Sequence, residues 1–225
     1  MLQNLTPGEF DAHLAGQTLR LAFVGMSNGG KSYRSKVLHH EKEFTWYQVD
    51  EEIGRALGLA NIESMSAWLG YPADEGYAKR EGQYLELEGR FTKNASQQVH
   101  GTNFVFDTTG SVVHLNQEAL SALRDNVLVV HLDVGEDSIP KMLERFFAEP
   151  KPVAWSGYFA TEEGEPVETA LKRSYPHLLH QRLSRYRNLA HINIPAQELH
   201  DATGMQTLST IRSYLSEVPV VSSRL

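Results

Sequence analysis

One eight-residue stretch, residues 25–32, constrains the fold of this chain more than any other part of its sequence. It reads Gly-Met-Ser-Asn-Gly-Gly-Lys-Ser and matches the phosphate-binding loop pattern G-x-x-x-x-G-K-[ST] in full. An apolar run over residues 19–24 precedes it, and residues 33–38 behind it have helical spacing. The loop is therefore predicted to join a buried strand to the N-terminus of a helix. This context favours an α/β fold that binds a nucleoside triphosphate, and the alternative is a glycine-rich turn with an incidental Lys-Ser pair.

The residue types of this loop suit the binding of a phosphate group. Successive backbone N–H groups and the helix dipole attract an anion, and Gly30 lets the backbone approach it closely. Lys31 supplies a mobile ammonium for the terminal phosphates, and the hydroxyl of Ser32 can bind magnesium. We therefore predict ATP and Mg²⁺ as cofactors. The residues predicted to bind the nucleotide are Gly25, Met26, Ser27, Asn28, Gly29, Gly30, Lys31, Ser32 and Tyr33.

Composition indicates a globular enzyme and excludes several other classes. The 225 residues are 41% hydrophobic, which suffices for one core, so residues 1–225 are expected to form a single domain. There are no cysteines, which excludes disulfides and thiolate metal sites, and no apolar run is long enough to span a membrane. Without a signal pattern either, the expected location is the cytoplasm, with no membrane partner.

Charge bears on the class of partner. The net charge is −7, and the 21 basic residues are scattered among acidic ones, which argues against a nucleic-acid-binding surface. A small-molecule acceptor is favoured over a polymer. We expect a monomer or a weak homodimer.

Strand and helix signals alternate along the chain. The candidate strands, each followed by a turn or a helical stretch, are residues 19–24, 45–49, 104–106, 127–132 and 191–194. Five such strands predict a parallel sheet, and residues 127–132 are apolar enough to be covered on both faces. A long helix is predicted within residues 73–99, over the acceptor side. An irregular, mobile lid is predicted near residues 150–165, where packing is the preferred interpretation of Trp155.

Carboxylates stand where the predicted strands end. Ligands bind outside the carboxyl ends of parallel strands, so Asp50, Asp107 and Asp133 are expected near the phosphate-binding loop. Their roles there would be metal binding and activation of an acceptor hydroxyl. The alternative is capping of the next helix. Capping is preferred for Asp133, and a functional role is preferred for Asp50 and Asp107.

The order of these motifs over roughly residues 17 to 215 resembles the shikimate kinase family, within the nucleoside monophosphate kinase-like group of P-loop enzymes. The resemblance implies a three-layer P-loop NTPase fold. Its parallel sheet has five strands in the order 2-3-1-4-5, with helices on both faces and a lid. It also implies an acceptor-binding helical region at about residues 50–100 and a lid at about residues 146–170.

The acceptor side departs from the family pattern in several places. Gln48-Val49-Asp50 stands for the family's Asp-x-Asp, which implies that Asp50 contacts the acceptor hydroxyl and acts as base. Because Gln48 replaces the first Asp, Ser32 and Asp107 would carry the metal. Ala78 stands where a carboxylate-binding Arg is expected, so Lys79 or Arg80 would substitute. The family's glycine triplet has become Thr108-Thr109-Gly110, which implies acceptor contacts from Thr109 and Gly110.

The nucleotide side keeps more of the pattern. Arg145 and Lys151 resemble the cations of the pre-lid helix and the lid, where they would compensate the charge of the transferred phosphoryl group. Residues 182–190 match the family's Arg-x-x-x-Tyr-x-x-x-Ala, which implies that Arg182 clamps an anionic group of the acceptor. The strand at 191–194 and the following Pro195 and Ala196 would approach the adenine.

These observations predict a kinase that transfers the phosphoryl group of ATP to a hydroxyl of a small, anionic metabolite. The residues expected to act in catalysis are Lys31, Asp50, Arg145 and Lys151. Three alternatives stay open: a kinase for a different acceptor, a nucleotide-binding NTPase or regulator that phosphorylates no acceptor, and a non-catalytic ATP-binding protein.

Overall fold

A computed structural model describes residues 5–98, 101–149 and 151–217. Its centre is a parallel sheet of five strands in the order β2-β3-β1-β4-β5. The order and the parallel pairing confirm the prediction from sequence. The strands are β1 (Arg20–Val24), β2 (Thr45–Gln48), β3 (Phe104–Asp107), β4 (Leu128–Asp133) and β5 (Ile192–Pro195).

Helices connect successive strands. The chain forms α1 (Pro7–Ala15), α2 (Lys31–Lys42), α3 (Val49–Leu57), α4 (Ile62–Leu69), α5 (Tyr77–Gln97), α6 (Gln117–Asn126), α7 (Ile139–Ala148), α8 (Val167–Leu189) and α9 (Gly204–Ser213). Short 3₁₀ turns occupy Val112–His114, Glu136–Ser138 and Ala196–Leu199. In the part of the chain that the structure describes, no helix is both long and apolar enough to cross a bilayer.

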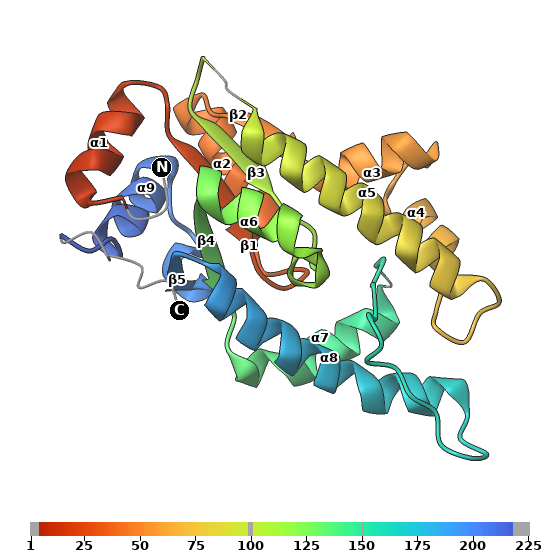
Figure 1. The fold of residues 1–225 in the computed structure, drawn as a ribbon. Coiled ribbons are helices and arrows are strands. Elements are labelled where there is room, and N and C mark those ends of the chain that lie inside the picture. The colour runs from red at the N-terminus through yellow and green to blue at the C-terminus, as the bar shows by residue number, and fades with distance from the viewer. Residues whose placement is uncertain (1–4, 99–100, 150, 218–225) are drawn as a thin grey trace.

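The sheet separates two hydrophobic clusters, which gives the three-layer architecture (Figure 1). Alternate side chains of a strand point to opposite faces, so Ala22 and Val24 join one cluster while Leu21 and Phe23 join the other. Helices α5, α6 and α8 contribute to the first cluster, and α1, α2 and α9 to the second. Strand β4 is buried on both faces, as its apolar run predicts.

The carboxyl ends of the strands meet at one edge, where β1 enters the phosphate-binding loop. Strand β2 pairs with β3 through Gln48 and Asp107, so the chain that leaves β2 lies beside the end of β3. Helix α3 begins there, and α4 follows it after a short turn. The long helix α5 packs along α3, α4 and α6. The long helix predicted within residues 73–99 is therefore present.

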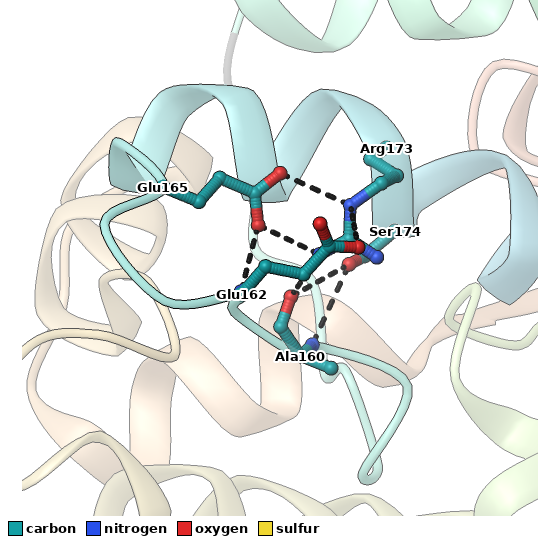
Figure 2. Close-up of polar contacts among 5 residues, drawn as sticks. All are labelled: Ala160, Glu162, Glu165, Arg173 and Ser174. Atoms are coloured by element: carbon teal, nitrogen blue, oxygen red, sulfur yellow. Dashed lines mark hydrogen bonds and ion pairs between the residues drawn. The ribbon is translucent and has the colours of Figure 1, made fainter.

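The segment between α7 and α8 has no regular secondary structure in its described residues, as expected, but it is tied to the body. Trp155 is buried, with 1% of its surface exposed, in agreement with the packing interpretation. Figure 2 shows a second attachment, at the start of α8. There the Arg173 guanidinium donates to both carboxylate oxygens of Glu165 (3.0 and 2.7 Å) and to the Ala160 carbonyl (2.9 Å). Packing and ion pairing thus hold the segment on α8.

Candidate active site

The phosphate-binding loop runs from the end of β1 to the start of α2, as predicted. Gly30 is the N-cap residue of α2, and Lys31 begins the helix. Gly25 has a φ of 141°, and a Cβ there would lie 2.9 Å from the Leu132 carbonyl oxygen of β4. Only glycine tolerates both the backbone conformation and that contact. The residue at the start of the loop is therefore dictated by the close packing of loop and sheet.

The ammonium of Lys31 is held inside the loop. Its Nζ donates to the carbonyl oxygens of Gly25 and Met26, both at 2.9 Å. Burial lowers the pKa of Lys31 to about 8, although Asp50 and Asp107 nearby favour the charged form. A bound anion beside this buried ammonium would stabilise its charged form further. The loop thus has the geometry and the charge to hold a phosphate group.

A cavity of about 610 Å³, which we call the Asp50 cavity, opens beside this loop. It brings together side chains from the loop, from the ends of β2 and β3, and from α3, α4 and α5. Its polar and charged lining residues are Ser27, Asn28, Lys31, Ser32, Gln48, Asp50, Glu51, Arg55, Asn61, Tyr84, Asp107, Thr108 and Lys151. Of the residues predicted for catalysis, Lys31, Asp50 and Lys151 therefore share one cavity.

Ser32 and Asp107, the two predicted metal ligands, are in direct contact. The Ser32 hydroxyl donates to Oδ2 of Asp107 at 2.5 Å, and the Trp46 indole N–H donates to Oδ1 at 2.5 Å. Hydroxyl and carboxylate oxygens are ligands that Mg²⁺ accepts, so the pair fits this ion. No cluster of three or more His, Cys, Asp or Glu side chains that could hold a metal occurs within residues 5–98, 101–149 and 151–217. Phosphate oxygens and water would complete the coordination.

Asp50 lies in the first turn of α3 and faces the cavity. It does not cap the helix, because the N-cap position is Gln48. The Tyr84 hydroxyl, from α5, donates to Oδ1 of Asp50 at 3.2 Å. Burial raises the pKa of Asp50, and the nearby Lys31 ammonium opposes that rise. A carboxylate that is less acidic than usual suits a group that accepts a proton from a hydroxyl.

A second carboxylate, Glu88, lies one helical turn beyond Tyr84 on α5. Glu88 is fully buried and accepts hydrogen bonds from the Thr109 and Ser111 hydroxyls, the latter at 2.5 Å. Burial raises its pKa to about 7. Thr109 is therefore turned into the protein interior and does not line the Asp50 cavity, although its neighbours Thr108 and Gly110 do.

Gly110 lies between the Asp50 cavity, which it lines, and the Arg182 side chain. A Cβ at this position would lie 2.8 Å from the Ser27 hydroxyl and 3.4 Å from a terminal nitrogen of Arg182. The Arg182 side chain is buried and donates to the Ala154 carbonyl (2.6 Å) and to His114 (3.2 Å). It lines a small cavity of about 20 Å³, which Ser27, Asn28 and Lys151 also line. Arg182 thus lies behind the phosphate-binding loop.

Lys151 connects the segment after α7 to the loop. Its ammonium donates to Oδ1 of Asn28 at 2.6 Å. On the opposite side of Asn28, a wider cavity of about 1220 Å³ is lined by Gly29, Gly30, Tyr33, Pro195 and Ala196, among others. The predicted position of the adenine, beside the end of β5, lies in this wider cavity.

Three predicted residues lie away from the cavities that surround the loop. Arg145 is exposed on α7, and Lys79 is exposed on α5. Arg80 donates to the carbonyls of Leu69 (3.0 Å) and Glu75 (2.9 Å), so it ties the end of α4 to the start of α5. None of the three lines the cavity that contains Asp50. The sequence pattern placed them correctly on their helices but not on the face that meets the site.

Asp133, for which capping was preferred, makes structural contacts. Its carboxylate accepts the Gly135 backbone N–H at 2.8 Å and the Arg187 Nε–H at 2.8 Å. The carboxylate therefore fixes the turn after β4 and ties it to α8.

Sequence reasoning missed Trp46, Tyr84 and Glu88 as parts of the site. Each meets its partner across a long sequence separation: 61 residues for Trp46 and Asp107, and 34 for Tyr84 and Asp50. A usable signal existed for Glu88, because it follows Tyr84 by four residues on the buried face of α5. A carboxylate on an apolar helix face needs polar partners, and that requirement points to a buried network.

Comparison with known proteins rests on structure. The sequence matches no known protein-family profile, and it matches no curated protein. Three shikimate kinase structures are similar. The one from Bacteroides thetaiotaomicron has a TM-score of 0.58 at 16% identity and covers 87% of this chain and 97% of its own. The Acinetobacter baumannii enzyme, solved with shikimate, has a TM-score of 0.55 at 18% identity over 90% and 94%. The Aquifex aeolicus enzyme has 0.55 at 19% over 86% and 94%.

This likeness confirms the resemblance read from the sequence at the level of the fold. The chain has the α/β three-layer fold of the shikimate kinase-like P-loop kinases. At identities of 16–19% the likeness does not extend to the acceptor.

Proposed function

We propose that this protein is a small-molecule kinase that transfers the γ-phosphoryl group of ATP to a hydroxyl of its acceptor. One observation carries the proposal: the half-buried carboxylate of Asp50 shares a cavity with the phosphate-binding loop. An ATPase needs only the loop and a metal site. A carboxylate with a raised pKa on the far side of the transferred phosphoryl group suits an alcohol acceptor.

Several residues that line the cavity have a role in this reaction. The loop amides and the Lys31 ammonium hold the β- and γ-phosphates, and Lys151 approaches from the segment after α7. Asp50 orients the acceptor hydroxyl and takes up its proton, and the Tyr84 hydroxyl fixes the orientation of Asp50. The segment between α7 and α8, whose Lys151 and Pro152 line the cavity, excludes water, which would otherwise compete as the acceptor.

Ser32 and Asp107 would hold magnesium, which when bound neutralises charge on the β- and γ-phosphates. The Trp46 indole positions Asp107 for this role from the edge of the sheet. Because Trp46 occupies one carboxylate oxygen, Asp107 presents the other toward Ser32.

The test is a screen of small hydroxylated compounds for release of ADP in the presence of Mg²⁺ and ATP, with ³¹P NMR to identify the product. We expect at least one compound to stimulate ADP release and to appear as a phosphate ester. Asp50→Asn serves as the control, because it should remove ester formation while nucleotide binding persists. Hydrolysis of ATP at a rate that no acceptor changes, and that Asp50→Asn leaves intact, would instead identify an NTPase.

A further inference from the structure

The wall of the Asp50 cavity that lies away from the phosphate-binding loop in the chain determines what kind of acceptor can bind. It is built by the end of β2, α3, the turn after α3, and α4. Its polar side chains are Gln48, Glu51, Arg55 and Asn61, and its apolar ones include Ile62 and Met65. This wall therefore offers hydrogen-bonding groups and an apolar edge on the same side of the cavity.

Among the residues that line this wall, Arg55 is the single cation, and it is already paired with carboxylates. Arg55 donates to Glu52 at 2.5 Å and lies 3.8 Å from Glu51. Its side chain is 65% exposed and that of Glu51 is 59% exposed, so the paired side chains contact solvent as well as the cavity. Glu51 in turn accepts the Gln48 amide N–H at 2.5 Å. With Asp50 added, the charges of the wall sum to a negative value.

The other two cations of the cavity belong to its phosphate end. Lys31 donates into the loop, and Lys151 donates to Asn28. Both are needed there, because a bound triphosphate brings several negative charges. Neither is left to neutralise an anionic group of the acceptor.

The cations that the sequence offered for an anionic acceptor lie elsewhere. Lys79 is exposed, and Arg80 bonds backbone carbonyls between α4 and α5. Arg182 lies behind Gly110, where it bonds Ala154 and His114. An acceptor carboxylate in the Asp50 cavity would thus face Asp50, Glu51 and the triphosphate with no unpaired cation from the described lining to compensate it.

We infer that the acceptor carries no negative charge and is an uncharged polyhydroxylated molecule with one apolar edge. This inference rests on the proposed function and departs from the expectation from sequence that the acceptor is anionic. Hydroxyl groups of such a molecule find acceptors in Asp50 and Glu51 and a donor in Gln48. Its apolar edge packs against Ile62 and Met65.

Matched pairs of compounds test the inference directly. Each pair differs in one charged group: glucose and glucuronate, sorbitol and gluconate, ribose and ribose 5-phosphate, and shikimate and its reduced alcohol. Binding is measured by saturation-transfer NMR and calorimetry with the wild-type chain, Mg²⁺ and a non-hydrolysable ATP analogue. We expect the uncharged member of at least one pair to bind about tenfold or more tightly than its anionic partner.

A charge reversal on the wall provides the second arm. Glu51→Lys should raise the affinity for the anionic members about fivefold or more, because it replaces the repelling carboxylate by a cation. Glu63→Lys makes the same change of charge on an exposed position of α4 that does not line the cavity, and it should leave the preference unchanged. Glu51→Gln is the milder variant if the reversal disturbs folding, and it should shift the preference in the same direction.

Failure of the inference can be told apart from failure of the proposed function. If the nucleotide analogue binds and the anionic members bind more tightly, or if no uncharged member binds at about 10 mM, the inference is overturned while the nucleotide site stands. If the analogue itself does not bind, the proposed function fails. An equal response of Glu51→Lys and Glu63→Lys would also overturn the inference, because it would show that net charge and not the wall sets the preference.

Discussion

The two halves of the Asp50 cavity differ in how the chain builds them. The phosphate end comes from one contiguous loop, residues 25–32, with Lys151 and Asp107 brought beside it. The acceptor end is assembled from the end of β2, three helices and the turn between two of them. A loop that follows one strand keeps its chemistry in a short motif. An assembled wall can change its chemistry by single substitutions without disturbing the fold.

The two ends of the cavity also differ in charge. The phosphate end holds the buried Lys31, whose pKa burial lowers to about 8, and the acceptor end holds Asp50, whose pKa burial raises. Each group compensates part of the burial cost of the other. The cavity is thus polarised between a cationic end at the loop, which suits phosphate groups, and an acidic end at α3, which suits hydroxyl groups.

The largest effect should come from the phosphate end. Lys31→Ala removes the buried ammonium, so turnover should fall about a thousandfold because the charge of the phosphoryl group loses its main compensation. The exposed Lys36 on the same helix supplies the control, and Lys36→Ala should retain activity. Steady-state kinetics measures both, with circular dichroism to check folding. Equal activity of the two variants would remove Lys31 from the mechanism.

The acceptor end should respond differently. Asp50→Asn keeps the shape of the side chain but removes its ability to take up a proton, so kcat should fall about a hundredfold. The affinity for the ATP analogue should change little, because the loop is intact. Asp137→Asn, in the exposed turn before α7, is the matched control. Parallel losses of kcat and nucleotide affinity would erase the distinction between the two ends.

The pH dependence of the free energy of unfolding tests Glu88, the buried carboxylate on α5. The pKa of Glu88 is about 7 in the folded chain, against an ordinary value of 4.5. Because the folded pKa is the higher one, its stabilising contribution is complete below pH 4.5 and is lost as the pH rises through 7. The loss amounts to about 3 kcal/mol at most.

Glu88→Gln should remove this part of the pH dependence. Denaturant unfolding at about pH 4.5, 6 and 8 measures it. The control Glu86→Gln, at an exposed position of the same helix, should keep the wild-type decline. If both variants decline as the wild type does, Glu88 does not titrate in this range.

The smallest effect is expected at Tyr84. Tyr84→Phe removes the hydroxyl that donates to Asp50 at 3.2 Å, so kcat should fall by roughly two- to tenfold. Loss of this donor also raises the pKa of Asp50 further, so the acid limb of the pH–kcat profile should move to higher pH. An unchanged acid limb would mean that Tyr84 only fills space.

The fold followed from the sequence because its signals are local. Apolar runs placed the five strands within one or two residues, and the loop motif located the ligand-binding edge. The carboxylates Asp50 and Asp107 were found because strand ends meet at that edge. These inferences need only the neighbouring residues and the general behaviour of parallel sheets.

The direction in which side chains point from the long helices could not be predicted from the sequence. Lys79 and Arg80 were expected at the acceptor, but adjacent helix positions point in different directions, and neither one faces the cavity. The position of Arg182 behind Gly110 depends on contacts with Ala154 and His114, which are distant in sequence. Such partners can be read only from the folded chain.

The central claim is that the loop at residues 25–32 binds the polyphosphate of a magnesium nucleotide. Isothermal titration calorimetry with Mg²⁺ and a non-hydrolysable ATP analogue, repeated in saturating pyrophosphate, tests it most directly. We predict saturable binding that pyrophosphate suppresses and that Lys31→Ala weakens strongly. Absence of binding heat, or binding that pyrophosphate leaves unchanged, would contradict it.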